Sequence, residues 1–334
     1  MNLLFLIFII AKTNAETFFI FVFMEKYPGF VNDSPFVDWN PDPVIFFIPG
    51  TERPIVWYGL LFALAFVGSF YLMNKIFRKE NRSQKDLDLL TLYVIAGTVL
   101  GARLGHCLFY GPWFGEDGYL SHPLNMLKIW EGGLASHGGA IGILIALFLY
   151  TRKTKENIWW ILDRIVIAVS FSGMCIRIGN LMNSEIIGRE TNLPWGFRFI
   201  QDGIERSFGS IHYFNSIPYD DQVKFVESIP ARHPSQLYES IFFLFLLVGC
   251  YFLWQKKKYK WPAGFMFGLF ISILFTFRFC IEFVKEVQVS FESSLPIDMG
   301  QLLSLPFIAA GIFIMILARK KNKFHAVPKE VGKK

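Results

Sequence analysis

The sequence predicts an all-α integral membrane protein with about seven transmembrane helices, and three observations support this fold class. First, 53% of the 334 residues are apolar, and the mean hydropathy is +0.39. Second, apolar runs such as residues 55–73 and 302–317 approach the roughly 20 helical residues that cross a hydrocarbon core. Third, Lys and Arg gather in short connections between these runs. A soluble all-α protein would need several long, nearly uncharged helices in one core, so we set that alternative aside.

The first 53 residues are expected to precede the membrane domain as an N-terminal extension and an external segment. The apolar run at residues 3–11 carries a Lys after it and none before it, whereas a secretory signal carries its positive charge first. Met24 is therefore an alternative start of the chain. Residues 25–53 are rich in Pro, Asp and aromatic residues, which favours a surface segment.

Seven apolar stretches follow as expected membrane spans, with edges placed to within several residues. They cover residues 55–74, 88–110, 134–151, 158–182, 239–254, 262–285 and 301–318. We therefore expect the transmembrane domain over residues 54–319. The long aromatic connection between the fourth and fifth spans, about residues 183–238, is expected to fold into a small external cap.

Basic residues alternate between the connections and so predict an orientation. Clusters of Lys and Arg follow the first, third, fifth and seventh spans, whereas the 111–133 connection has only Lys128 and the 286–300 connection has none. Because cytoplasmic loops carry the excess of Lys and Arg, we expect the N-terminus outside and the basic tail, residues 320–334, in the cytoplasm. The net charge of +6 thus reflects membrane topology and does not indicate a nucleic-acid partner.

Polar residues gather at one predicted depth, near the outer ends of the spans. The run from Arg177 to Gly188 ends the fourth span, Arg278 and Glu282 end the sixth, and Arg103 lies in the outer half of the second. Other polar residues at this level are Tyr58, His106, His137, Asn180 and Tyr238. A charged side chain at mid-bilayer costs roughly 2.5–3.5 kcal/mol on insertion scales. Such a cluster indicates a site for a lipid headgroup or another anion, and arginine forks suit phosphate.

Simpler structural interpretations remain open for several of these residues. Arg278 and Glu282 are four residues apart on one helix face, which allows them simply to neutralise each other. Arg177 is close enough to the outer surface to extend into the headgroups. Asp163 and Arg164 are expected to form an ion pair at the cytoplasmic interface.

The glycine-rich run at residues 132–142, which contains His137, also has two interpretations. Small residues permit a close helix contact, which needs no chemical role. Gly138 and Gly139 would equally let the backbone approach a phosphate closely. The four cysteines all lie in apolar runs, and their spacing suggests neither disulfides nor a metal site.

Eight motifs follow one another along the membrane domain. They are Val56–Gly59, Gly101–Gly105, Glu131–Gly142, Asp163–Arg164, Arg177–Arg189, Arg232–Glu239, Phe277–Phe283 and Met299–Pro306. In this order they resemble the bacterial prolipoprotein diacylglyceryl transferase family, over about residues 54–319. The run from Arg177 to Gly188 is the family's most specific signature, whereas residues 196–230 do not align.

The resemblance implies an enzyme of the bacterial cytoplasmic (inner) membrane. Members of the family move the diacylglyceryl group of phosphatidylglycerol onto the thiol of a lipobox cysteine, in the first step of lipoprotein maturation. A thioether forms and glycerol phosphate leaves. The expected partners are phosphatidylglycerol, preprolipoprotein signal peptides with a lipobox cysteine, and membrane lipids. No metal or soluble cofactor is implied.

The resemblance also implies roles for individual residues. Arg177 and Arg278 would hold the phosphate and headgroup, with Glu282 orienting Arg278. His137 is the candidate base or a headgroup contact, and Tyr238 or a group perturbed by an arginine is the alternative base. Tyr58 and Tyr238 would supply hydroxyls. The expected substrate-binding residues, besides Arg177, are Arg103, Gly138, Gly139, Asn180, Asn183, Glu185 and Gly188.

The residue types fit this chemistry independently of the resemblance. A thiol with a pKa of about 8.5 needs a base at neutral pH, and a phosphodiester leaving group needs cations. A transporter of anions would place polar residues at the midplane and show an internal repeat, and the sequence has neither. A metal-dependent phosphatidyl transferase would need an Asp-rich cluster, which the spans lack. A purely structural membrane protein leaves three arginines at one depth unexplained.

Overall fold

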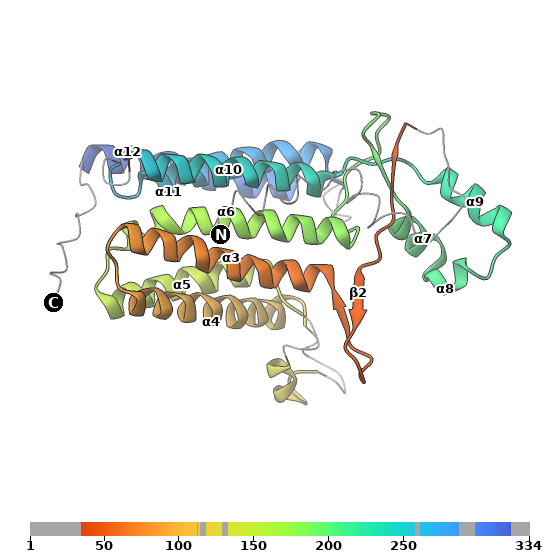
Figure 1. Ribbon diagram of the computed structural model, residues 1–334, viewed down its shortest axis with the longest axis horizontal. Helices are drawn as coiled ribbons and strands as arrows, with labels where there is room; N and C mark the ends of the chain where they lie inside the picture. The colour runs from red at the N-terminus through yellow and green to blue at the C-terminus, as the bar shows by residue number, and fades with distance from the viewer. Residues whose placement is uncertain are drawn as a thin grey trace. The chain divides into compact units, whose positions relative to one another are not determined.

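The computed structural model describes residues 35–111, 113, 118–128, 133–257, 261–286 and 298–321 (Figure 1). Most of the predicted extension and basic tail, together with Glu131 and Gly132, lies outside these residues. The chain divides into two compact units. Unit 1 comprises Met1–Phe66, Ser172–Phe245 and Phe275–Leu305, and unit 2 comprises Val67–Phe171, Leu246–Leu274 and Pro306–Lys334.

Long helices form at all seven expected spans. They are α3 (Trp57–Lys79), α4 (Gln84–Phe109), α5 (Ser136–Thr154), α6 (Ile158–Met182), α10 (Ser235–Lys257), α11 (Phe265–Ile281) and α12 (Met299–Lys321). Within the described residues, six of these helices are long and apolar enough to cross a membrane. The span of α11 reaches this length because it continues into the 3-10 turn η3 (Glu282–Val284). The exception is α5, which has polar residues at its start and Arg152 and Lys153 in its last turn. The predicted all-α membrane fold is confirmed.

In unit 2, α4 and α5 pack closely through glycines (Figure 1). A Cβ added to Gly142 would overlap the carbonyl oxygen of Gly97, and one added to Gly138 would overlap that of Gly101. Because the obstructing atoms are backbone atoms, no side chain fits without moving a helix. The interpretation of the glycine-rich run as a close helix contact is therefore supported.

Unit 2 also contains a buried polar cluster around Glu80 at the end of α3. The Glu80 carboxylate accepts hydrogen bonds from Trp160 Nε1 (2.7 Å) and Trp254 Nε1 (2.6 Å), and it pairs with Arg164 Nε at 3.2 Å. All four side chains are buried, and a buried charge needs such partners. The cluster therefore fastens α6 and α10 to the end of α3.

The expected ion pair of Asp163 and Arg164 stays a prediction, and each of the two residues has a further partner. Both side chains are buried, and Arg164 forms an ion pair with Glu80. Asp163 accepts hydrogen bonds from the backbone N–H groups of Gly264 and Phe267, both at 2.8 Å. A carboxylate at this position satisfies amides that the first turn of α11 leaves unbonded, so Asp163 caps that helix.

In unit 1, the connection between α6 and α10 folds as the predicted cap. It contains the strand β4 (Phe197–Phe199) and the helices α7 (Ile200–Phe208), α8 (Ile211–Phe214) and α9 (Tyr219–Ser228). These helices share a small apolar core made of Ile200, Ile204, Phe214, Val226 and Ile229. The cap therefore has a hydrophobic core of its own.

The described residues before α3 form three strands, and the first of them attaches to the cap. β1 (Val37–Trp39) pairs in parallel with β4, and β2 (Val44–Phe47) pairs antiparallel with β3 (Pro54–Val56). Arg198 forms a bidentate pair with Asp38, at 2.6 and 2.9 Å. These contacts connect the segment before the first span to the start of the cap.

Candidate active site

The predicted site residues are divided between the two units. Unit 1 contains Tyr58, Arg177, Asn180, Asn183, Glu185, Gly188, Tyr238, Arg278 and Glu282. Unit 2 contains Arg103, His137, Gly138 and Gly139. Direct contacts link most of the unit 1 residues, so the candidate site is described first within that unit.

The segment that follows α6 runs between two other segments of unit 1. Gly188 N–H donates to the carbonyl oxygen of His233 (2.9 Å), and Arg189 N–H donates to that of Val284 (2.8 Å). A Cβ on Gly188 would lie 2.6 Å from His233 Cβ and 2.7 Å from the carbonyl oxygen of Val284. No side chain fits there. Gly188 therefore allows three backbone segments to meet beside the site.

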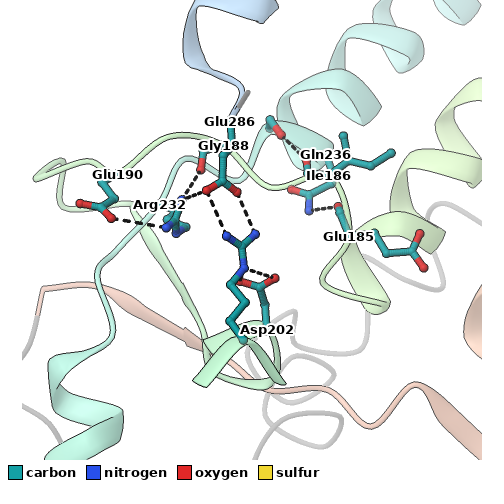
Figure 2. A network of polar contacts seen from close by, with 10 residues as sticks. Glu185, Ile186, Gly188, Glu190, Asp202, Arg232, Gln236 and Glu286 are labelled. Atoms are coloured by element: carbon teal, nitrogen blue, oxygen red, sulfur yellow. Dashed lines mark hydrogen bonds and ion pairs between the residues drawn. The ribbon is translucent and has the colours of Figure 1, made fainter. Parts of the chain in front are cut away.

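The turn just before Gly188 has an unusual backbone that α10 holds in place. Ser184 and Ile186 have positive φ angles of 54° and 57°, a region that residues other than glycine rarely adopt and that is most unusual for the β-branched Ile186. Ser235 Oγ donates to the carbonyl oxygen of Ile186 (2.7 Å), and Gln236 Nε2 donates to that of Glu185. Figure 2 shows Gln236 pointing toward this turn. The first turn of α10 thereby positions the backbone of Glu185.

A chain of polar side chains connects Arg177 to Glu185. Arg177 Nη1 donates to Asn180 Oδ1 (3.3 Å), and Asn180 Nδ2 donates to Glu185 Oε2 (3.1 Å). Asn183 Nδ2 donates to Glu185 Oε1 (2.9 Å). These four polar residues of the signature run, Arg177, Asn180, Asn183 and Glu185, therefore form one hydrogen-bonded group.

Glu239 and Lys285, which we did not predict as site residues, join Arg177 to Arg278. Glu239 Oε2 lies 3.1 Å from Arg177 Nε, and Glu239 Oε1 accepts from Lys285 Nζ at 3.0 Å. Glu282 Oε1 lies 3.9 Å from Lys285 Nζ and 3.5 Å from Arg278 Nη2. We call this set, Arg177–Glu239–Lys285–Glu282–Arg278, the charged row. It alternates in sign and contains three cations and two carboxylates.

The charged row is buried at its centre and open at its arginine ends. The side chains of Lys285 and Glu239 are 4% and 6% exposed, whereas those of Arg177 and Arg278 are 18% and 37% exposed. Burial lowers the pKa of Lys285 from its usual value, and Glu239 opposes that shift. Among the described residues, no group accepts a hydrogen bond from Arg177 Nη2. The row can therefore offer donors and one excess positive charge to an anion.

The two predicted tyrosines occupy different surroundings. The ring of Tyr58 packs on α6, where a Cβ added to Gly179 would lie 2.9 Å from Tyr58 Cδ2. Tyr238 OH accepts from Trp195 Nε1 (3.1 Å) and lies 3.2 Å from His233 Nδ1. Burial lowers the pKa of His233, which favours its neutral form. The hydroxyl of Tyr238 is thus hydrogen-bonded to Trp195 of the cap.

In unit 2, Arg103 donates to backbone carbonyls. Its Nε, Nη2 and Nη1 groups bond the carbonyl oxygens of Met126 (2.8 Å), Asn125 (2.7 Å) and Gly133 (3.2 Å). These carbonyls belong to the 3-10 helix η1 (Pro123–Leu127) and to the segment before α5. Arg103 therefore organises this connection, and its contact with substrate stays a prediction.

His137 lies in the first turn of α5 and is exposed. Its ring makes no hydrogen bond with the described part of the chain. Gly138 faces α4, as described above, and a Cβ on Gly139 would meet Ala102 Cβ at an ordinary 3.6 Å. The proposed roles of these three residues toward a substrate also stay predictions.

Among its described residues, the chain thus has six helices long and apolar enough to cross a membrane and a charged row at the ends of α6 and α11, which defines the class of helical membrane proteins. A sequence model of the prolipoprotein diacylglyceryl transferase family matches residues 43–317. The chain therefore belongs to the prolipoprotein diacylglyceryl transferase family.

Individual relatives agree with this assignment. The phosphatidylglycerol–prolipoprotein diacylglyceryl transferase of Tolumonas auensis is 43% identical over 285 residues, which cover 85% of this chain and 98% of the relative. The enzyme of the same name from Porphyromonas gingivalis is 42% identical over 293 residues, covering 85% and 95%. That from Cereibacter sphaeroides is 31% identical over 307 residues, covering 86% and 98%.

Proposed function

We propose that the chain transfers the diacylglyceryl group of phosphatidylglycerol to the cysteine thiol of prolipoproteins, and that the charged row binds the lipid phosphate. Family membership supports the reaction, and the charged row is the observation that carries the site. The cysteine sulfur forms a bond to the terminal glyceryl carbon, and the bond from that carbon to the phosphate oxygen breaks. Glycerol phosphate leaves with the bonding electrons, and a base accepts the thiol proton.

The charged row suits this step because negative charge grows on the departing phosphate. Arg177 and Arg278 stand at its open ends, and each is paired with a glutamate that fixes its orientation. The glutamates do not cancel the positive charge completely, since Lys285 adds a third cation. Preorganised cations of this kind stabilise a developing anion without reorganising at the moment of reaction.

The identity of the base is a separate part of the proposal. His137 is our first candidate, because a neutral imidazole can accept a thiol proton near neutral pH. Tyr238 is the alternative. Tyr58 supplies a hydroxyl, Asn180, Asn183, Glu185 and Gly188 shape the site, and Arg103, Gly138 and Gly139 contact substrate in this proposal. No metal or soluble cofactor takes part.

The proposed setting is the bacterial cytoplasmic (inner) membrane. The alternation of basic connections supports an external N-terminus and a cytoplasmic C-terminus. Residues 54–319 then form the catalytic membrane domain, with the cap at about 183–238 outside and the tail at 320–334 inside. Preprolipoproteins present a lipobox cysteine next to their signal peptide, at the outer leaflet where phosphatidylglycerol also lies.

A transfer assay tests the reaction. Membranes that contain the chain, phosphatidylglycerol and a lipobox peptide are expected to add one diacylglyceryl group to the peptide cysteine, measured as a mass gain. A peptide with serine in place of that cysteine should gain nothing. If the cysteine peptide gained no mass while a related enzyme assayed in parallel was active, the result would contradict the proposal.

A pH–rate profile tests the base. His137→Gln is expected to remove the acid limb of the profile and to lower the rate by about 10²–10⁴, the usual contribution of general base catalysis. His212→Gln, an exposed histidine of α8, is the matched control and should behave as wild type. A His137→Gln enzyme that keeps both the acid limb and most of its rate shows that another group takes the proton.

A further inference from the structure

Unit 2 contains a cavity between the beginning of α6 and the end of α12, and none of its lining residues belongs to the candidate active site. Its volume is about 380 Å³, which lies in the range of ligand-binding pockets. The residues that form its two main walls are Asn157, Trp159, Ile314, Leu317, Ala318 and Lys321. Because most of these side chains are apolar, the cavity suits part of an aliphatic chain.

The four α12 residues of the lining lie on one face of that helix. Ile314, Leu317, Ala318 and Lys321 follow one another at spacings of three, one and three residues, which is the repeat of a single helix face. α12 is apolar enough to cross a membrane, and its last turn is basic, so this end of the helix meets water. The apolar part of the face therefore lies deeper in the membrane than Lys321. A lipid has the same polarity, with its chains inside and its headgroup at the surface.

The wall from α6 depends on a glycine at the start of α11. Trp159 packs on that glycine, since a Cβ added to Gly264 would lie 2.7 Å from Trp159 Cε3. Gly264 has a φ angle of 91°, a region that favours glycine, and its N–H donates to the Asp163 carboxylate. The cap of α11 that Asp163 provides thus also fixes the turn against which the indole lies. The indole is an apolar surface of the kind found at membrane interfaces.

Two hydrogen-bond donors of the lining have no partner in the described part of the chain. Asn157 Oδ1 accepts from Trp159 N–H (2.9 Å), so the other end of the Asn157 amide is its NH2 group. That NH2 group donates to no described residue, and Lys321 Nζ has no ion-pair or hydrogen-bond partner there. Both side chains are exposed, so a ligand in the cavity can reach them. The donors suit the oxygens of a phosphate.

The charges around the cavity favour an anion. Among the described residues that line it, Lys321 is a cation and none is a carboxylate. Glu156, which precedes the lining in the chain, is already paired with Arg82. Arg319 lies over the Phe265 ring, 5.0 Å from its centroid, and is thereby engaged within the protein. A ligand in the cavity therefore meets the positive charge of Lys321, which no described carboxylate offsets.

We propose that this cavity binds an anionic phospholipid of the leaflet where α12 ends, with one acyl chain along the apolar face of α12 and the phosphate at Lys321 and Asn157. Basic pockets between membrane helices typically bind such headgroups. A zwitterionic lipid would bring a second, positive group toward Lys321, and a soluble anion would leave the apolar walls uncovered. The inference does not depend on the proposed transfer reaction. The lipid in this cavity is not consumed, and it joins the ends of α6 and α12.

Photo-cross-linking of the full chain in mixed micelles tests the inference. The probe is phosphatidic acid with a diazirine in one acyl chain, and the matched probe is phosphatidylcholine with the same chains. Mass spectrometry of the cross-linked peptides separates labelling at α12 from labelling at the charged row. The variant is Lys321→Gln, and the control is Lys320→Gln, the neighbouring exposed lysine on another face of α12. Neither ammonium has a bond to lose in the described residues, so both variants are expected to fold.

Wild type and Lys320→Gln are expected to be labelled at Ile314 and Leu317 about fivefold more strongly by the phosphatidic acid probe than by the phosphatidylcholine probe. This is the factor that one basic residue near a membrane surface contributes. Lys321→Gln should lose this preference, whereas labelling at the charged row should stay the same. Equal labelling of wild type by the two probes overturns the inference, and so does an unchanged preference in Lys321→Gln. A loss that is equal in both variants shows a diffuse surface charge and also overturns it.

Competition identifies the source of the phosphate. Unlabelled phosphatidic acid is expected to displace the probe from α12, whereas inorganic phosphate at the same concentration should leave the labelling unchanged. Displacement by inorganic phosphate to the same extent would show that the cavity binds a soluble anion, and the lipid assignment would be wrong. The assay needs no acceptor and no transfer, so its result does not depend on whether the chain performs the proposed reaction.

Discussion

Arg177→Lys is expected to lower kcat/KM for diacylglyceryl transfer by about 10²–10³, the loss seen when one preorganised donor to a developing anion is removed. Two nitrogens of the guanidinium have partners in the described residues, and the third has none. Nε faces Glu239, Nη1 donates to Asn180, and Nη2 is left for a ligand among the described residues. A lysine keeps the positive charge, but a single ammonium on a different stem cannot serve all three directions.

The control for this variant is Arg78→Lys, at an exposed position near the end of α3. It makes the same chemical change away from the charged row and should keep nearly full activity. If Arg177→Lys were also close to wild type, Arg177 would act only as a diffuse charge near the headgroups. That result would support the simpler interpretation of an arginine extended to the membrane surface.

Glu239→Gln is expected to have the second-largest effect, because it breaks the centre of the charged row. The substitution keeps the shape of the side chain and removes the charge between Arg177 and Lys285. Removing one partner of a buried ion pair typically costs about 3–5 kcal/mol of stability. Burial already lowers the pKa of Lys285 and Glu239 opposes that shift, so the variant should lower that pKa further. We expect a lower unfolding temperature and a large loss of transfer activity.

A second variant separates the two consequences. Glu239→Gln/Lys285→Met also removes the buried cation that has lost its nearer carboxylate, so its stability should recover toward wild type. If Glu239 positions Arg177, the activity of this double variant stays below that of Lys285→Met alone although the protein is stable again. Recovery of both stability and activity would contradict a positioning role and leave Glu239 as a partner of Lys285 alone.

The fold followed from the sequence because each span carries its own signal. Long apolar runs with few charges located seven helices, and α6 begins and ends where the apolar run predicted. The cap was predicted from its length and aromatic content. Its separate core depends on contacts among residues such as Ile204, Phe214 and Val226, which a linear pattern does not reveal.

The candidate site was only partly predictable. Arg177, Arg278 and Glu282 stand out because a charge in an apolar run is costly. Lys285 follows Arg278 and Glu282 on one helical face, at spacings of four and then three residues, and this periodicity could have indicated it. Glu239 could not have been placed, because its partners come from α6 and from the end of η3, both distant in sequence.

Other residues were correctly singled out in the sequence, but each allowed more than one interpretation. Gly138 was predicted to require a small residue, and in the structure the position that a Cβ would occupy lies against the backbone of α4. Arg103 was a buried cation, and its bonds lead to backbone carbonyls. Composition identifies positions where bulk or charge matters, whereas only the tertiary packing distinguishes a ligand contact from a structural one.

Retention of phosphatidylglycerol by the purified protein tests the central claim, that the charged row binds the lipid phosphate. The measurement compares wild type, Arg177→Lys and Arg78→Lys in the absence of peptide, with a zwitterionic phospholipid as competitor. We predict that wild type and Arg78→Lys retain phosphatidylglycerol selectively, and that Arg177→Lys loses about tenfold or more of this selectivity because the Nη2 donor left for the phosphate is gone. Equal, selective retention by Arg177→Lys and wild type would contradict the claim.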